Sequence, residues 1–111
     1  MKRESLIFLV MVLLSASAPA SADTVMVKYR GPVNLDNFSC ESVNRSSFVN
    51  RVCYQQSSRY MVINLSGTYY HYCRIGPEIV GALMQASSMG RFYNQNIKGQ
   101  YDCRAGGVPN G

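Results

Sequence analysis

Residues 48–73 read FVNRVCYQQSSRYMVINLSGTYYHYC, and this stretch decides the fold. It contains three runs of β-branched and aromatic residues, at 48–54, 59–65 and 68–73, which are separated by polar sequences. Ser66-Gly67, between the second and third runs, is typical of a two-residue hairpin turn. Residues 55–58 predict a four-residue turn between the first and second runs. The stretch therefore predicts three antiparallel strands in a meander.

The segment that follows changes to a helical period. Gly76-Pro77 places a proline at the first helical position. Apolar residues then recur at a spacing of three to four until Gly90, which would end the helix. Because an amphipathic helix cannot bury its apolar face alone, it should pack across the sheet. The expected fold class is α+β, a three-stranded antiparallel meander packed by one α-helix, with residues 91–111 irregular.

The N-terminal residues have the pattern of an export signal. Lys2 and Arg3 precede an apolar run at 6–14, and small residues end the segment at Ala20-Ser21-Ala22. This order is typical of a secretory signal peptide over residues 1–22, cleaved after Ala22. The apolar run is much shorter than the ~20 residues that span a bilayer. We therefore expect a secreted or periplasmic protein, with no transmembrane segment in the mature chain.

The expected compartment indicates the role of the four cysteines. An even number of cysteines in a short exported chain predicts structural disulfides that staple the fold, here among Cys40, Cys53, Cys73 and Cys103. Their spacing contains no Cys-x-x-Cys, which argues against metal binding and thiol redox chemistry.

The predicted strand pairing narrows the choice of disulfides. It places Tyr60 opposite both Cys53 and Cys73, one on each side of the central strand. Those two cysteines would lie ~9.6 Å apart, whereas a disulfide seldom exceeds ~6.8 Å between α-carbons. Two pairings remain open: Cys40 with Cys53 and Cys73 with Cys103, or Cys40 with Cys73 and Cys53 with Cys103.

Several ordered motifs occur between residues 46 and 98. They are Ser46-Ser47, Val52-Cys53-Tyr54, the hairpin at 67–72, Ala86-Ser87-Ser88-Met89-Gly90-Arg91-Phe92-Tyr93 and Asn94-Gln95-Asn96-Ile97-Lys98. With these motifs, residues 46–98 resemble the KTSC domain, a small family also found at the C-terminus of some lysyl-tRNA synthetases. The resemblance implies a domain of unknown activity for which RNA binding has been suggested. It leaves residues 23–45 as an N-terminal extension and residues 99–111 as a C-terminal tail.

Aromatic and basic side chains are concentrated on the predicted sheet. Strand alternation places Tyr70 and Tyr72 on one face, and Tyr69, His71 and Tyr60 on the other. One helix can cover only one of these faces. The predicted binding residues are therefore Tyr60, Tyr69, Tyr70, His71, Tyr72, Arg51, Arg59 and Arg74. Such rings can stack on sugars or bases while arginines bind anionic groups. The alternative is that the tyrosines serve strand packing.

Catalysis finds little support in the sequence. His71 is the single histidine, and nothing places an acidic residue beside it to complete a Ser–His or Cys–His arrangement. We therefore expect no enzyme, no catalytic residue, no cofactor and no metal.

Charge and composition leave three classes of binding function. Beyond residue 22 the chain has nine basic and five acidic side chains, a moderate positive charge that favours anionic partners. The favoured hypothesis is an exported non-catalytic binding module whose partner is a protein or an anionic envelope polymer. Nucleic-acid binding is the less favoured alternative. Inhibition of an exported hydrolase such as lysozyme is opposed by charge, because lysozymes are commonly basic and like charges slow encounter.

Overall fold

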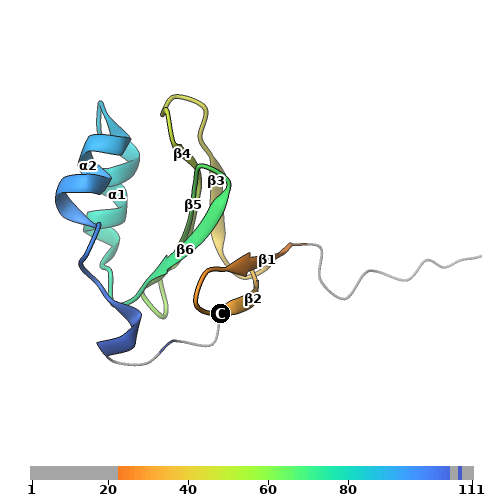
Figure 1. Ribbon diagram of the computed structural model, residues 1–111. Coiled ribbons are helices and arrows are strands. Elements are labelled where there is room, and N and C mark those ends of the chain that lie inside the picture. Colours follow the sequence, from red (N-terminus) through yellow and green to blue (C-terminus); the bar gives the residue numbers. More distant parts are fainter. Residues whose placement is uncertain (1–22, 106–107, 109–111) are drawn as a thin grey trace, which may run out of the picture.

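The structure, a computed structural model, describes residues 23–105 and residue 108 (Figure 1). Its six strands are β1 (Thr24–Val27), β2 (Gly31–Asn34), β3 (Ser39–Ser42), β4 (Val49–Gln55), β5 (Tyr60–Leu65) and β6 (Thr68–Tyr72). Two α-helices, α1 (Pro77–Gln85) and α2 (Met89–Asn96), and the 3-10 helix η1 (Cys103–Ala105) follow. The predicted signal peptide lies outside the described residues. Among residues 23–105 and 108, no helix has the length and apolar character needed to span a membrane.

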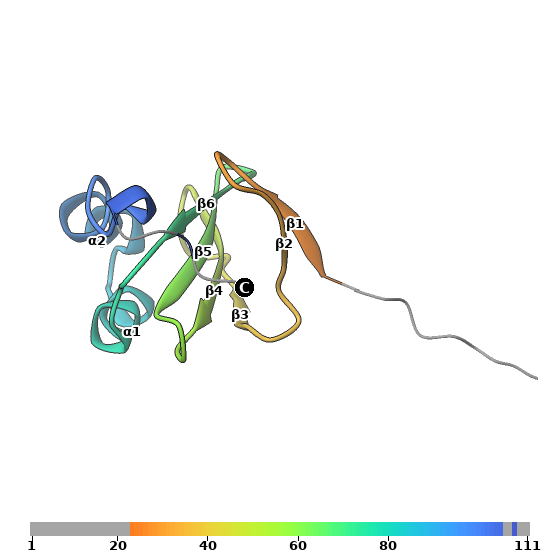
Figure 2. The ribbon, with the colours of Figure 1, turned by 90° about the horizontal axis from the view of Figure 1, so that it is seen from below.

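All six strands join one mixed sheet in the order β2-β1-β6-β5-β4-β3. Neighbouring strands are antiparallel except β1 and β6, which are parallel at Val27 and Tyr69. The edge strands β2 and β3 are joined by residues 35–38 alone, so the sheet curls (Figure 2). The expected three-stranded meander packed by one helix is therefore wrong. The meander exists as β4, β5 and β6, but β1, β2 and β3 extend it on both sides and two helices cover it.

The predicted strand register is correct between β5 and β6 and wrong between β4 and β5. Val62 pairs with His71 between β5 and β6, as expected, and the turn between them has Ser66 at φ 53° and Gly67 at φ 92°. These angles match a type I′ hairpin. Between β4 and β5, however, Cys53 pairs with Val62 rather than with Tyr60, because the loop occupies 56–59. The shift of two residues leaves every side chain on its predicted face, since strand alternation has a period of two.

Two clusters of buried side chains lie on opposite faces of β5, whose first four residues are all buried. Met61 and Ile63 face the helices and pack with residues such as Leu83 of α1. Tyr60 and Val62 face the inside of the curl. There they meet Val27, Val33, Leu35 and the buried cysteines Cys53, Cys73 and Cys103. The face that the helices leave free is thus covered by β1, β2 and the segment after α2.

The expectation of one helix followed by an irregular segment is wrong, because a second helix, α2, covers Met89–Asn96. The helix α1 ends at Gln85, where the Arg45 guanidinium donates hydrogen bonds to the carbonyl oxygens of Ala86 (2.7 Å) and Met84 (2.6 Å). These bonds satisfy carbonyl groups that a helix end leaves without partners. Ser88 then begins α2, and its hydroxyl accepts from the Arg91 amide at 3.2 Å, as an N-cap residue does. Gly90 is consequently inside α2 and does not terminate a helix.

Gly90 is required by close packing, and this gives a first prediction. A Cβ atom at Gly90 would lie 2.5 Å from Cε1 of Phe48, whose ring packs edge-to-face on Tyr93. We expect Gly90→Ala to lower the free energy of unfolding, measured in urea, by about 1–3 kcal/mol. Gly81→Ala is the matched control, because a Cβ there meets nothing within 4 Å and α1 favours alanine. An equal gain in stability for both variants would contradict the packing explanation.

Two disulfides join Cys40 to Cys53 and Cys73 to Cys103, which is the first of the two pairings left open by the sequence. Cys40 and Cys53 are cross-strand partners on β3 and β4. The second disulfide ties η1 to the residue that follows β6. Both are compatible with an exported protein, since such bonds persist in oxidising compartments.

Candidate binding groove

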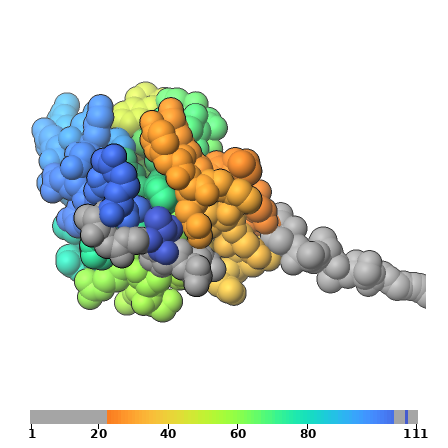
Figure 3. All heavy atoms as spheres, turned by 60° about the horizontal axis from the view of Figure 1, so that its bottom comes forward, coloured from red at the N-terminus to blue at the C-terminus, as the bar shows by residue number. Residues whose placement is uncertain are grey.

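A groove of about 690 Å³ opens between the β1–β2 turn, β6 and the segment after α2. We call it the binding groove, and its lining includes Lys28, Tyr29, Tyr70, His71, Tyr72 and Arg104. Figure 3 shows the orange β1–β2 segment and the blue C-terminal segment on either side of green strand residues.

The β1–β2 turn forms one wall. The Lys28 amide donates to the carbonyl of Tyr69 at 2.9 Å, and the chain then turns away from β6. Tyr29 is in the left-handed region at φ 69°, and 88% of it is exposed. Such a conformation is uncommon outside glycine. The Lys28 ammonium lies 5.4 Å from the Tyr29 ring centre and 5.9 Å from the Tyr70 ring centre, within cation–π range of both.

The opposite wall is the segment 99–104, which is fastened to the end of β6. The disulfide joins Cys103 to Cys73, and the Cys73 amide donates to the carbonyl of Tyr101 at 2.9 Å. The Arg74 guanidinium donates to the carbonyl of Asp102 at 2.6 Å. Three separate contacts thus hold this wall against β6.

Asp102 and Arg104 place a charge pair at the outer rim of that wall. Their side chains lie 2.7 Å apart, and 91% of the Arg104 side chain is exposed. Hydrogen bonds from the Arg104 side chain and backbone lower the pKa of Asp102 to about 2. Among the described residues around the groove, the cations Lys28, Arg74 and Arg104 outnumber the carboxylate of Asp102.

His71 lies at the base of the groove, above the buried Tyr60. The Tyr60 hydroxyl is 2.8 Å from Nδ1 of His71, and the two rings meet edge-to-face. Burial lowers the pKa of His71, the positive charge of Arg30 lowers it further, and Asp102 opposes both effects. His71 is therefore neutral at pH 7. Burial also raises the pKa of Tyr60, although a hydrogen bond from Arg30 lowers it.

The lowered pKa of His71 predicts a pH dependence of stability. In the unfolded chain His71 titrates near its ordinary pKa of about 6.5, so below that pH the unfolded state binds more protons than the folded state. The free energy of unfolding should then fall as pH decreases from about 7 to 5. Urea unfolding at several pH values should show a smaller fall for His71→Gln. An unchanged slope in the variant would contradict this assignment. Asp23 and Asp102 also have lowered pKa values, but their contribution is lost at a lower pH.

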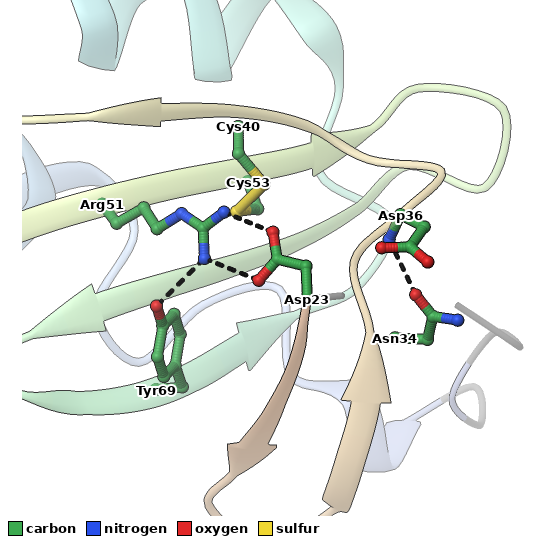
Figure 4. The surroundings of a disulfide bond; sticks show 7 residues. All are labelled: Asp23, Asn34, Asp36, Cys40, Arg51, Cys53 and Tyr69. Atoms are coloured by element: carbon green, nitrogen blue, oxygen red, sulfur yellow. Dashed lines mark hydrogen bonds and ion pairs between the residues drawn. A yellow bond between two sulfur atoms is a disulfide. The ribbon is translucent and has the colours of Figure 1, made fainter. Parts of the chain in front are cut away.

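Arg51 and Tyr69 do not line the binding groove. Their side chains lie beside the Cys40–Cys53 disulfide (Figure 4). The Arg51 guanidinium donates to the Asp23 carboxylate at 2.6 and 3.1 Å and to the Tyr69 hydroxyl at 3.2 Å. The hydrogen bond from Arg51 lowers the pKa of Asp23, although burial partly opposes it. These contacts hold Asp23, the residue before β1, against β4.

The predicted site residues are thus only partly brought together. Tyr70, His71 and Tyr72 line the binding groove, Tyr60 lies beneath it and Arg74 supports its wall. Arg59 ends the β4–β5 loop in the left-handed region at φ 54°. Lys28, Tyr29 and Arg104 also line the groove, and none of the three was predicted as a site residue. The triplet Lys28-Tyr29-Arg30 before Gly31-Pro32, an aromatic between two cations at a turn, is the signal that could have found the first two.

The motif residues around 45–48 and 87–95 line a second hollow of about 440 Å³. Contacts within the fold account for several of them. The Ser46 hydroxyl accepts from the amide of Val49 at 3.1 Å, and Ser88 and Arg45 cap the helices as described. Among the described residues, no cluster of three or more His, Cys, Asp or Glu side chains is placed to hold a metal ion.

Comparisons with known proteins agree with this architecture. The sequence model of the KTSC domain matches residues 45–101. The crystal structure of a KTSC domain protein from Yersinia pestis matches with a TM-score of 0.55 and 26% identity, covering 59% of this chain and 92% of that one. An uncharacterized protein from Stutzerimonas stutzeri (strain A1501) is 47% identical over 36 residues, 32% of this chain and 51% of the relative. The chain spans about half the length of that relative. Since the domain model covers just over half of its 111 residues, the chain belongs to the KTSC domain family.

Proposed function

We propose that this protein is a non-catalytic binding module that holds an anionic ligand in the binding groove. The observation that carries the proposal is the position of Lys28, whose ammonium lies close to the rings of Tyr29 and Tyr70 at the wall of the groove. A cation beside aromatic faces suits a ligand with acidic groups on an extended, partly apolar body. The volume of about 690 Å³ is within the usual range of ligand sites.

The proposal places the protein outside the cytoplasm, with a ligand in the cell envelope. The two disulfides support this location, because such bonds rarely persist in reducing compartments. Nucleic acid is a weaker candidate. Stacking of successive bases needs exposed aromatic faces on one surface, but Tyr60 is fully buried and Tyr69 and Tyr70 lie on opposite faces of β6.

Titration calorimetry with two acidic polymers, poly-glutamate and an oligogalacturonate, tests the proposal. We expect at least one to bind, and its affinity to decrease with added salt. Lys28→Ala should weaken binding about tenfold, the effect of losing one charged contact. Arg91→Ala is the matched control, since Arg91 is an exposed cation that lines the other hollow.

Two outcomes would overturn this function. One is that neither polymer binds at low salt, and the other is that Lys28→Ala and Arg91→Ala weaken binding equally. A single-stranded oligonucleotide included in the same series should bind more weakly than the better acidic polymer. Tighter, Lys28-dependent binding of the oligonucleotide would favour the nucleic-acid alternative.

A further inference from the structure

We propose that the ligand of the binding groove is an acidic peptide segment of a partner protein, which crosses the groove and bonds through one residue to the main chain of His71 in β6. This inference rests on the proposed function and names its ligand class. It comes from the directions of main-chain groups along β6.

Among residues 23–105 and 108, the strand β6 has a full neighbour on one side only. Five residue pairs join it to β5, whereas β1 reaches it at the single pair Val27 and Tyr69. Beyond Tyr69 the β1–β2 turn leaves the sheet, and the side of β6 that faces away from β5 borders the binding groove. Lys28 bonds to this edge at Tyr69 and Tyr101 bonds to it at Cys73, so among the described residues the part of the edge left for a ligand is His71.

The register fixes which residue of β6 faces that edge. Leu65 and Thr68 flank the two-residue turn and form a hydrogen-bonded pair, so even-numbered residues of β6 bond to β5. Odd-numbered residues then direct their N–H and C=O groups to the other side. The bonds from the Lys28 amide to the Tyr69 carbonyl and from the Cys73 amide to the Tyr101 carbonyl, both 2.9 Å, confirm this alternation. His71 lies between them, and its main-chain N–H and C=O face the groove.

Those two groups suit a peptide in the extended conformation. One residue of a peptide that crosses the groove can accept from the His71 amide and donate to its carbonyl, the pair of bonds that a residue makes in strand addition. A polysaccharide could meet the cations of the groove, but it has no amide N–H and C=O at the spacing of a strand. The groove therefore favours a peptide over an anionic sugar polymer.

The charges around His71 indicate acidic side chains on that peptide. Lys28 lies on one wall of the groove, and Arg104 and Arg74 lie at the other, so cations flank the edge on both sides. Alternate side chains of an extended chain lie on one side and are separated by about 6.8 Å. Acidic residues at alternate positions would therefore lie on the face where the Lys28 ammonium is, 5.9 Å from the Tyr70 ring centre.

Nuclear magnetic resonance on the ¹⁵N-labelled mature chain tests this geometry. The probes are a blocked seven-residue peptide of alternating glutamate and valine, the same peptide with its central amides N-methylated, and trigalacturonate. We expect the unmodified peptide to bind and to move the His71 amide proton downfield, as a new hydrogen bond does. N-methylation should weaken binding at least tenfold without changing the charge. Lys28→Glu should weaken binding of the unmodified peptide at least tenfold, and Arg91→Glu less than twofold.

The outcomes separate this inference from the proposed function. If trigalacturonate or the peptide binds in a Lys28-dependent manner but the His71 amide does not shift, the inference of bonding to the His71 main chain is overturned and the proposed function stands. Equal binding of the plain and N-methylated peptides also overturns it. If no acidic probe binds, including the two polymers, both the function and this inference are wrong.

Discussion

Replacing Cys73 and Cys103 together by alanine is expected to lower the free energy of unfolding by about 3.5 kcal/mol, from the chain entropy of a bridge that spans 30 residues. The same change should abolish binding of the acidic probes. The disulfide is the covalent link between β6 and the wall that carries Asp102 and Arg104. Without it, that wall is held by the hydrogen bonds from the Cys73 amide and the Arg74 side chain and by the packing of Tyr101 against the core.

The double variant Cys40→Ala/Cys53→Ala separates stability from function. Its bridge spans 13 residues, so its loss should cost about 3 kcal/mol, nearly as much as the loss of the other. It joins β3 to β4, however, and lies away from the binding groove. The two double variants should thus have similar free energies of unfolding in urea. Calorimetry should detect binding of the acidic probes to Cys40→Ala/Cys53→Ala but not to Cys73→Ala/Cys103→Ala. Retained affinity in the Cys73→Ala/Cys103→Ala protein would show that the wall is not needed.

The central meander was predictable because its strands carry strong local signals. Each is rich in β-branched and aromatic residues, and Ser66-Gly67 fixes the β5–β6 register through its turn type. The β4–β5 loop gave no such signal. Its position depends on the left-handed conformation at Arg59 and on the bond from the Ser58 hydroxyl to the Gln55 side chain. Neither follows from composition, and the predicted register was wrong by two residues.

The outer strands and the second helix were missed for different reasons. Strands β2 and β3 have four residues each, and GPVN and SCES show no apolar alternation. Pro32 argues against a central strand, but an edge strand tolerates it. These strands form because closing the curl buries Val33 and Leu35 against β5, a tertiary effect that no local window contains. Gly90 was interpreted as a helix end, whereas its role is the close approach to Phe48.

The candidate site shows the same division between local and long-range information. The sequence identified Tyr70, His71 and Tyr72 because they are crowded on one strand. Lys28 and Arg104 are separated from them by dozens of residues, and they reach the groove through the parallel β1–β6 contact and the Cys73–Cys103 bridge. A site assembled by long-range connections cannot be read from spacing along the chain.

The second large effect is expected at Tyr60, the buried tyrosine that links β5 to the N-terminal strands. Tyr60→Ala should lower the free energy of unfolding by about 3–5 kcal/mol, the usual cost of removing a buried aromatic ring. Tyr60→Phe keeps the ring and should cost about 1–2 kcal/mol, because the hydroxyl beside His71 Nδ1 is lost. Urea unfolding monitored by circular dichroism measures both.

Hydrogen exchange would show where the Tyr60→Ala protein loosens. The Tyr60 ring contacts Phe38 at 5.9 Å between ring centres, and Val27, Val33 and Leu35 share its cluster. All four precede residue 45, where the match to the KTSC domain begins. Exchange at the Leu35 amide, which donates to the carbonyl of Asp23 at 2.8 Å, should therefore accelerate more than exchange at the Val80 amide of α1. Equal acceleration would mean that the N-terminal strands and the family domain open as one cooperative unit, so that Tyr60 anchors the whole fold and not the extension alone.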